Sequence, residues 1–272
     1  HSNRPDSAKV YRYMNRRTFT VASGLAAAGA SSVSAAPAAK SILELRFIRL
    51  RNNADNQRAR ISDFLKSAAL PAAQRIGVGP VGFFSGAIGL EGPVIVTLMS
   101  FPSLAAYEQA GQKHAADKQY SKAVAEVHAQ PGLAYMRQEA SLLRGFDGFP
   151  GIEAPKPLEK GSRIFEVRVY ESNNPLTLQR KMKMFDDGET AIFRRLNMLP
   201  VFFGETIVGR NMPNLTYMLA FESLEAREKA WRAFGSDPEW QKMRALPGLS
   251  DAEIVSNITN YILSPLPFSP IR

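Results

Sequence analysis

The sequence predicts an α+β protein built from two tandem repeats, each with the element order β-α-β-β-α-β, whose two sheets close into one barrel. The first observation behind this prediction is internal repetition. Pro80 in "GPVGFF" recurs 120 positions later as Pro200 in "LPVFFG", and the same shift carries Ser103 onto Ser223. The second is that strand-like and helix-like patterns follow each other in the same order in both halves.

The first repeat opens with a strand over 42–50, because Leu43 and Leu45 alternate with Glu44 and Arg46. Apolar residues at helical spacing predict the helices that follow, and Gly or Pro residues mark where the elements end. These are a helix over 55–76, a hairpin of "VGFFSGA" and "PVIVTLMSF" around Gly89 and Gly92, helices from Ser103 to Gln109 and over 117–129, and a closing strand in "ASLLRGF".

The second repeat follows the same order. Its expected elements are the strand "IFEVRVYES", a helix over 175–197, the strands "LPVFFGETIVG" and "NLTYMLAFES", helices over 224–234 and from 237, and the strand "SNITNYILSP". Ser236 stands three residues before Glu239, with Pro238 between them, which predicts a capping box at the start of the last helix.

A β-α-β-β-α-β unit is a ferredoxin-like sheet with helices on one face, and its bare face needs a partner. Two copies in one chain can supply that partner to each other, as the subunits of a homodimer would. We therefore expect an intramolecular dimeric α/β barrel of eight strands with the helices outside. The expected divisions are an extension and signal over 1–39, a first repeat over 40–147, a Pro- and Gly-rich linker over 148–162 and a second repeat over 163–272.

The N-terminal residues have the pattern of a twin-arginine export signal. Arg16 and Arg17 precede an Ala-, Gly- and Ser-rich run that carries no charge until Lys40. The pattern predicts cleavage within 35–39, a periplasmic or secreted protein and no integral membrane span after the signal is removed. A basic, disordered N-terminus with an accidental Arg pair is the alternative. Residues 1–13, before Met14, are interpreted as an upstream extension.

Composition narrows the function classes. The absence of cysteine excludes disulfides, thiolate catalysis, iron–sulfur clusters and cysteine-based zinc sites. The net charge of +9 falls to +5 without residues 1–38, which hold five Lys or Arg and one Asp. The remaining basic residues are scattered, and no aromatic-interleaved basic stripe accompanies them, so we expect no nucleic-acid partner.

The residues also resemble a known family. Glu44-Leu45-Arg46 and Glu166-Val167-Arg168 in the opening strands, then "FESLEAREKAWRAFGSDPEWQKM" over 221–243, resemble the NIPSNAP family of the dimeric α+β barrel superfamily. The resemblance covers 42–146 and 164–265. It implies the barrel fold, whereas eukaryotic members are linked to membrane trafficking and organelle quality control. Gln112 at the place of Arg232 and Tyr120 at the place of Trp240 depart from the pattern in the first repeat. These departures leave open a purely structural role for one half.

The candidate ligand-binding residues lie on the opening strands of the two repeats. The Glu and Arg of each strand are two positions apart, so their backbones lie about 6–7 Å apart on one face and their side chains can pair. If the apolar positions meet the helices, these charged positions point into the barrel. Arginines there would bind an anion that a glutamate orients or deprotonates; alternatively, each pair only neutralises itself. The residues concerned are Glu44, Arg46, Glu166, Arg168 and Tyr170 on the same face, and Tyr217 in an apolar wall with Phe83, Phe84, Phe202 and Phe203, which are otherwise plain core.

No metal site and no cofactor are expected. His114 and His128 lie 14 residues apart and cannot share an ion on one helix, and each is interpreted as an exposed helical residue rather than a haem ligand. No G-x-S-x-G elbow or phosphate-binding glycine loop is present.

Three functions remain open. The first is an exported protein that binds a small apolar or anionic molecule in a barrel cavity between the two repeats. The second is a cofactor-independent monooxygenase-like or isomerase-like enzyme, with Glu44 or Glu166 as the base and Tyr170 assisting. The third is a protein-interaction module that docks a partner on the helices of Trp231 and Trp240. A homo-oligomer is compatible with all three.

Overall fold

The computed structural model describes residues 39–52 and 54–272. The predicted signal and its cleavage region up to residue 38 lie outside the described residues. Among the residues that are described, no helix is both long and apolar enough to cross a bilayer.

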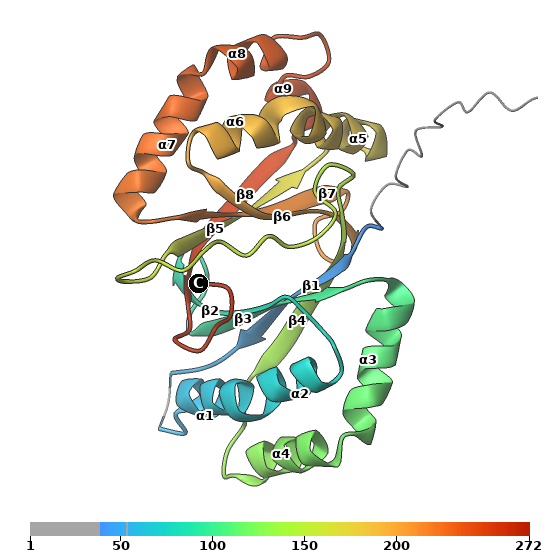
Figure 1. Cartoon of the computed structure of the whole chain (residues 1–272), viewed down its shortest axis with the longest axis vertical. Coiled ribbons are helices and arrows are strands. Elements are labelled where there is room, and N and C mark those ends of the chain that lie inside the picture. The colour runs from blue at the N-terminus through green and yellow to red at the C-terminus, as the bar shows by residue number, and fades with distance from the viewer. Residues whose placement is uncertain (1–38, 53) are drawn as a thin grey trace, which may run out of the picture. The chain divides into compact units, whose positions relative to one another are not determined.

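The described chain contains two halves with the same order of elements (Figure 1). The first half comprises β1 (Ile42–Arg49), α1 (Gln57–Phe64), the π-helical turn η1 (Leu65–Ala69), α2 (Leu70–Arg75), β2 (Val81–Ile88), β3 (Val94–Phe101), α3 (Leu104–Ala116), α4 (Lys118–Ala129) and β4 (Arg137–Gly145). The second comprises β5 (Ile164–Glu171), α5 (Pro175–Met184), η2 (Phe185–Glu189), α6 (Thr190–Arg195), β6 (Leu199–Val208), β7 (Asn214–Phe221), α7 (Leu224–Ser236), α8 (Pro238–Arg244), α9 (Asp251–Ile254) and β8 (Asn257–Pro265).

The strands form one closed antiparallel barrel in the order β1-β3-β2-β8-β5-β7-β6-β4. Each half contributes four adjacent strands, in the order β4-β1-β3-β2 and β8-β5-β7-β6. Two seams, β2 with β8 and β4 with β6, join the halves, and each contains a register shift. Helices α1–α4 cover one side of the barrel and α5–α9 the opposite side (Figure 1). The predicted α+β barrel is therefore confirmed.

The inside of the barrel is apolar, which corrects one expectation. Leu43 and Leu45 of β1 and Phe165 and Val167 of β5 belong to a single buried cluster that draws on strands of both halves. The alternate positions, including Glu44, Arg46, Glu166 and Arg168, therefore face the helices and not the barrel interior. The reversal has a simple cause: both faces of these strands are covered, so alternation alone does not say which face lies inside.

One end of the barrel is closed by irregular segments. Ile271, beyond β8, is fully buried in the interior cluster, and Ile152 of the predicted linker packs against the same cluster. Backbone hydrogen bonds from Glu153 to Val201 and from Leu266 to Phe83 fix these segments to the barrel. The linker thus helps to build the core as well as joining the halves.

One of the two predicted helix caps is confirmed, and the other is wrong. Ser103 caps α3 and Ser223 caps α7, each accepting a backbone hydrogen bond at 3.1 Å. Ser236 is instead the last residue of α7, and Asp237 caps α8 by accepting from the backbone N–H groups of Glu239 and Trp240. The expected Ser–Glu capping box at this helix is therefore wrong.

The closure of this end of the barrel can be tested by truncating the Ile271 side chain. We expect Ile271→Ala to lower the free energy of unfolding by about 2–4 kcal/mol, because it leaves a cavity in the apolar interior. Ile258→Ala, at a position that is 39% exposed, is the matched control and should cost much less. Urea unfolding of both variants measures the difference, and equal costs would show that Ile271 does not seal the barrel.

Candidate functional site

Each half carries a glutamate–arginine pair between its sheet and its long helix. In the first half Glu44 and Arg46 of β1 face α3, and in the second Glu166 and Arg168 of β5 face α7. The sequence correctly places each pair on one strand face. It does not reveal that the pairs lie in separate layers, on opposite sides of the barrel, so they cannot share one ligand on a central axis (Figure 1).

The first pair is held by few partners. Arg46 donates to both oxygens of Glu44, from Nε at 2.7 Å and from Nη2 at 2.8 Å. The Tyr107 hydroxyl of α3 donates to Glu44 at 3.0 Å, and the remaining Arg46 nitrogen donates to Gln138 at 2.6 Å. Burial and the neighbouring Glu44 charge raise the pKa of Tyr107, so its phenol stays protonated as a donor. The Arg46 side chain remains 34% exposed.

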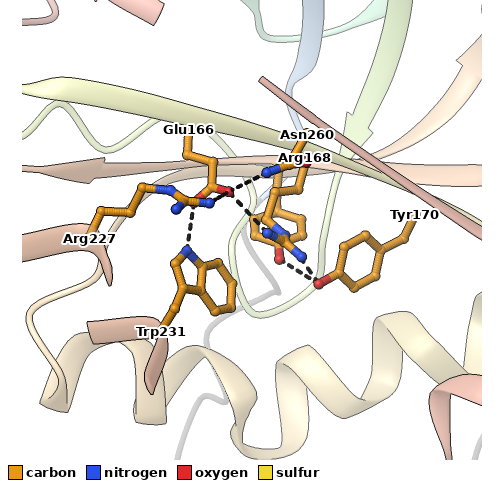
Figure 2. Close-up of polar contacts among 7 residues, drawn as sticks. Glu166, Arg168, Tyr170, Arg227, Trp231 and Asn260 are labelled. Carbon is orange, nitrogen blue, oxygen red and sulfur yellow. Dashed lines mark hydrogen bonds and ion pairs between the residues drawn. The ribbon is translucent and has the colours of Figure 1, made fainter. Parts of the chain in front are cut away.

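The second pair is saturated by its neighbours (Figure 2). Glu166 accepts from Arg168 at 3.0 Å, from Arg227 Nε at 2.9 Å and from the Trp231 indole at 2.6 Å, while Asn260 donates at 3.1 Å. Burial opposes ionisation of Glu166, but these hydrogen bonds and the two guanidinium charges hold its pKa below the usual value. A carboxylate held by so many donors is stabilised as an anion and is a poor general base.

Tyr170 and Tyr217 belong to the same closed arrangement. The Tyr217 hydroxyl donates to that of Tyr170 at 3.0 Å, and Arg168 donates to the Tyr170 hydroxyl at 3.3 Å. Burial raises the pKa of Tyr217 well above its ordinary value. Arg168 is stacked on the Trp231 ring at 4.4 Å. These side chains bind each other, which favours the self-neutralising interpretation for the second half.

Equivalent positions explain why the halves differ. In the strand register Thr97 lies opposite Arg46, where Tyr217 lies opposite Arg168. Gly111 occupies the place in α3 that Trp231 occupies in α7. Other first-half residues are also smaller or more polar than their counterparts: Leu65 for Phe185, Ala73 for Phe193 and His114 for Phe234.

The smaller side chains leave a pocket of about 340 Å³ in the first half. Its apolar wall combines residues of the sheet with residues of the helices. The wall comprises Ile48, Phe64, Leu65, Ala69, Met99, Phe101 and Ala110. The same space in the second half holds a cluster of aromatic rings that includes Phe185, Phe193, Tyr217 and Trp231, with centroids 5.2–6.0 Å apart.

Two polar atoms in the pocket wall are buried and find no hydrogen-bond partner in the described part of the chain. They are Thr97 Oγ1 and His114 Nε2. Burial lowers the pKa of His114, so the imidazole is neutral near pH 7 and has a nitrogen that can accept a proton. A buried polar atom without a partner costs about 1–3 kcal/mol, so a ligand atom that bonds to either of them is favoured.

Of the pocket lining, only Glu44 and Arg46 were predicted as site residues. His114 is half-buried against Tyr120, with ring centroids 4.7 Å apart, so the expectation of an exposed histidine is wrong here, whereas His128 is exposed as expected. The equivalent Phe234 and Trp240 rings are also 4.7 Å apart. Comparing the repeats position by position would have singled out Thr97 and Gly111 as the places where the first half loses volume.

The predicted aromatic wall is core, and the tryptophan helices do not present their indoles to a partner. Phe84 and Phe202 lie inside the barrel, whereas Phe83 and Phe203 lie under the helices. Trp240 is buried and Trp231 is half-buried with its indole bound to Glu166, so neither forms the exposed patch that a docking surface would need.

The second half is further filled by a buried ion pair. Lys181 of α5 donates to Glu189 of η2 at 3.2 Å and to Asp251 at 3.3 Å. The equivalent residues in the first half are Ile61 and Ala69, which are apolar and buried. Charge and ring packing in the second half therefore replace the apolar wall of the first.

Comparison with known proteins supports the family resemblance in the second half. Residues 165–270 match the NIPSNAP family model, and this range includes the motif at 221–243. No curated protein matches the chain. An uncharacterised NIPSNAP-like domain protein from Burkholderia xenovorans is 24% identical, covering 41% of this chain and 91% of its own, with a TM-score of 0.36.

Two solved structures are similar over most of the chain. A proposed monooxygenase from Fusobacterium nucleatum is 9% identical with a TM-score of 0.56, and the match covers 84% of this chain and 93% of that one. A proposed monooxygenase from Lactobacillus acidophilus is 12% identical with the same TM-score, covering 83% and 94%. At these identities the likeness concerns the fold alone.

The role of Glu166 as a structural anion can be tested by its pH dependence. Glu166→Gln should lower the free energy of unfolding at pH 7 by about 3 kcal/mol, because it leaves Arg168 and Arg227 without their buried counter-charge. The pKa of Glu166 is lower in the folded than in the unfolded chain. This stabilisation is therefore present above about pH 4.5 and is lost as the pH falls through the folded pKa.

Denaturant unfolding between pH 3 and pH 7 measures the effect. The gap between wild type and Glu166→Gln should narrow in acid, whereas Glu228→Gln, on the exposed side of α7, should cost little at any pH. A gap that does not change with pH would refute the assignment.

Proposed function

We propose that this protein binds a small, mostly apolar molecule with a polar group in the first-half pocket between β1, β3 and helices α1–α4. The supporting observation is the pocket of about 340 Å³ next to the sheet. In the second half aromatic rings fill the equivalent space, and the hollow that remains is a more open one at the surface, between Arg168, Arg227 and Trp231. The volume is in the range of small-molecule sites. This proposal keeps Glu44 and Arg46 among the residues that line the ligand site but moves the ligand from the barrel interior to the outer layer.

The lining defines the ligand chemistry. Aromatic and aliphatic side chains form most of the wall and suit a ring system. At the polar side, Arg46 is partly exposed and its charge is balanced by Glu44, so the site as a whole adds little net charge. Thr97 and His114 offer a hydroxyl and a neutral imidazole. A phenol or an enol therefore fits better than a strongly anionic ligand.

A cofactor-independent enzyme is the second candidate function. Two structures of similar fold are described as proposed monooxygenases, and His114 in this pocket is a neutral proton acceptor. The chemistry that these groups support is removal of a proton from an acidic O–H or C–H group of the bound ring, with Arg46 near the resulting anion. Glu44 is bound by Arg46 and Tyr107, so His114 is the better base.

Several further assignments accompany this proposal. The repeated element order supports two tandem ferredoxin-like repeats that arose by duplication, with the divisions at 40–147 and 163–272. Export by the twin-arginine route and a periplasmic or secreted location rest on residues 16–17 and the run behind them. Homo-oligomer formation stays a prediction.

Filling the pocket is the direct test. Gly111→Trp places an indole where the second half has Trp231, and a Cβ at Gly111 meets nothing within 4 Å. With 1-naphthol as the probe and fluorescence titration as the readout, Gly111→Trp should weaken binding at least about tenfold, which is about 1.4 kcal/mol. Gly111→Ala is the control and should stay within about twofold of wild type, because a methyl group leaves most of the cavity.

Equal 1-naphthol affinity in wild type and Gly111→Trp would refute the proposed site, as would the absence of binding to wild type. Oxygen uptake by the same samples separates binding from catalysis. Uptake that needs the protein and is lost in His114→Phe, the residue at the equivalent second-half position, would establish the enzyme. Binding without uptake would establish the binding protein for this probe.

A further inference from the structure

We infer that the open end of the barrel is a second binding site, for a small amphipathic carboxylate. This barrel mouth lies at the end opposite Ile271 and Ile152 and has a volume of about 440 Å³. Both halves line it, so it is distinct from the first-half pocket. Leu45, Phe47 and Arg49 line it from the first half, and Val169, Asn214 and Tyr261 from the second.

The inward-facing positions change from apolar to polar along the barrel axis. On β1, Leu43 and Leu45 lie in the apolar centre, Phe47 packs against it and Arg49 stands at the mouth. On β4 the same inward face runs from Leu143 out to Ser141 and Glu139, and β7 and β8 show the same change toward their mouth ends. A molecule that enters the mouth therefore meets charge first and apolar side chains below.

Two arginines and one carboxylate line the mouth itself. Three arginines surround the single carboxylate of Glu139, with nitrogen–oxygen distances of 3.5 Å for Arg49, 2.8 Å for Arg137 and 3.3 Å for Arg210. Farther out, Glu91 lies close to Arg137, and Glu171 accepts from Asn211 at 3.1 Å, so the excess of positive charge is confined to the lining, where Arg49 and Arg210 face Glu139. An anionic group is consequently favoured beside Arg49 and Arg210.

Arg49 has hydrogen-bonding capacity left over. Its Nε is buried and finds no partner among residues 39–52 and 54–272. One terminal nitrogen donates to the backbone oxygen of Glu91 at 3.3 Å, and the guanidinium lies 5.4 Å from the Phe47 ring centroid. A carboxylate beside Arg49 can accept from this guanidinium, which presents donors in a fixed fork.

The rim is held in place by a buried asparagine. Asn214 accepts from Thr206 at 2.6 Å and donates to the backbone oxygens of Arg210 and Asn211 at 2.9 Å. The turn that carries Arg210 is therefore positioned before any ligand arrives, which reduces the entropy cost of binding. Deeper in the mouth, the rings of Phe47 and Tyr261 pack edge to face with their centroids 5.8 Å apart and form an aromatic wall.

These observations select the ligand class. A neutral apolar molecule would leave the second arginine of the lining without a counter-charge, and a cation would be repelled by the arginines. A carboxylate with a short aliphatic or aromatic body places its charge at Arg49 and Arg210 and its body against Leu45, Phe47 and Val169.

The test compares octanoate, 1-octanol and octylamine, which share a chain and differ in the head group. Isothermal titration calorimetry of the full chain at pH 7 and low salt should show octanoate binding at least about tenfold more tightly than the other two. Arg49→Met should weaken octanoate binding about tenfold, and Arg49→Lys should recover part of the loss. Arg210→Met changes a side chain that is 76% exposed, so it should fold normally and weaken binding by a smaller factor.

Gly111→Trp, which fills the first-half pocket, is the control for location and should leave octanoate binding unchanged. Failure of wild type to bind octanoate at millimolar concentration would overturn the inference. So would equal affinity for octanoate and 1-octanol, or unchanged affinity in both arginine variants. Loss of octanoate binding in Gly111→Trp instead of Arg49→Met would place the ligand in the first-half pocket and also overturn it.

Discussion

The structure depends on the contact between the inner faces of two four-stranded sheets. Each sheet has an apolar inner face, and the residues of these faces form one buried cluster that neither half could bury alone. The two seams close the edges of both sheets, so the described barrel has no open strand edge. Ile271 and Ile152 then cover one end. The outer layers and both proposed sites are built on this closed frame.

Because the frame is shared, the two outer layers can diverge without loss of the fold. The second half fills the space next to its sheet with Glu166 and its arginines, the pair of Lys181 and Glu189, and packed aromatic rings. The hollow that remains lies at the surface of this layer. The first half keeps the same glutamate and arginine but has Thr97 and Gly111 where the second has large aromatic side chains. Smaller side chains make fewer packing contacts, so an empty pocket at this place lowers the stability of the fold, and a ligand that fills it restores the contacts.

The order and approximate bounds of the strands could be predicted from the sequence because alternation and turn residues are local signals. The direction of the charged faces could not, since the β1 and β5 strands are covered on both sides and the helices supply their own polar partners, Tyr107 and Arg227. The pocket also escaped prediction, because Thr97 lies on a strand and His114 on the following helix, and only the packing of the two elements brings them to one wall. A cavity between the repeats was predicted, but the residues of the mouth were not, because Arg49, Glu139 and Arg210 belong to three strands or turns that only the closed barrel brings together.

The difference between the two outer layers is the central claim, and xenon pressurisation of crystals tests it most directly. Xenon occupies apolar cavities that have room for it and does not enter filled space. The account predicts xenon density between β1, β3 and α3, beside Thr97 and Gly111, and none at the equivalent place between β5, β7 and α7. Equal xenon density in both layers, or density in the second half alone, would contradict it.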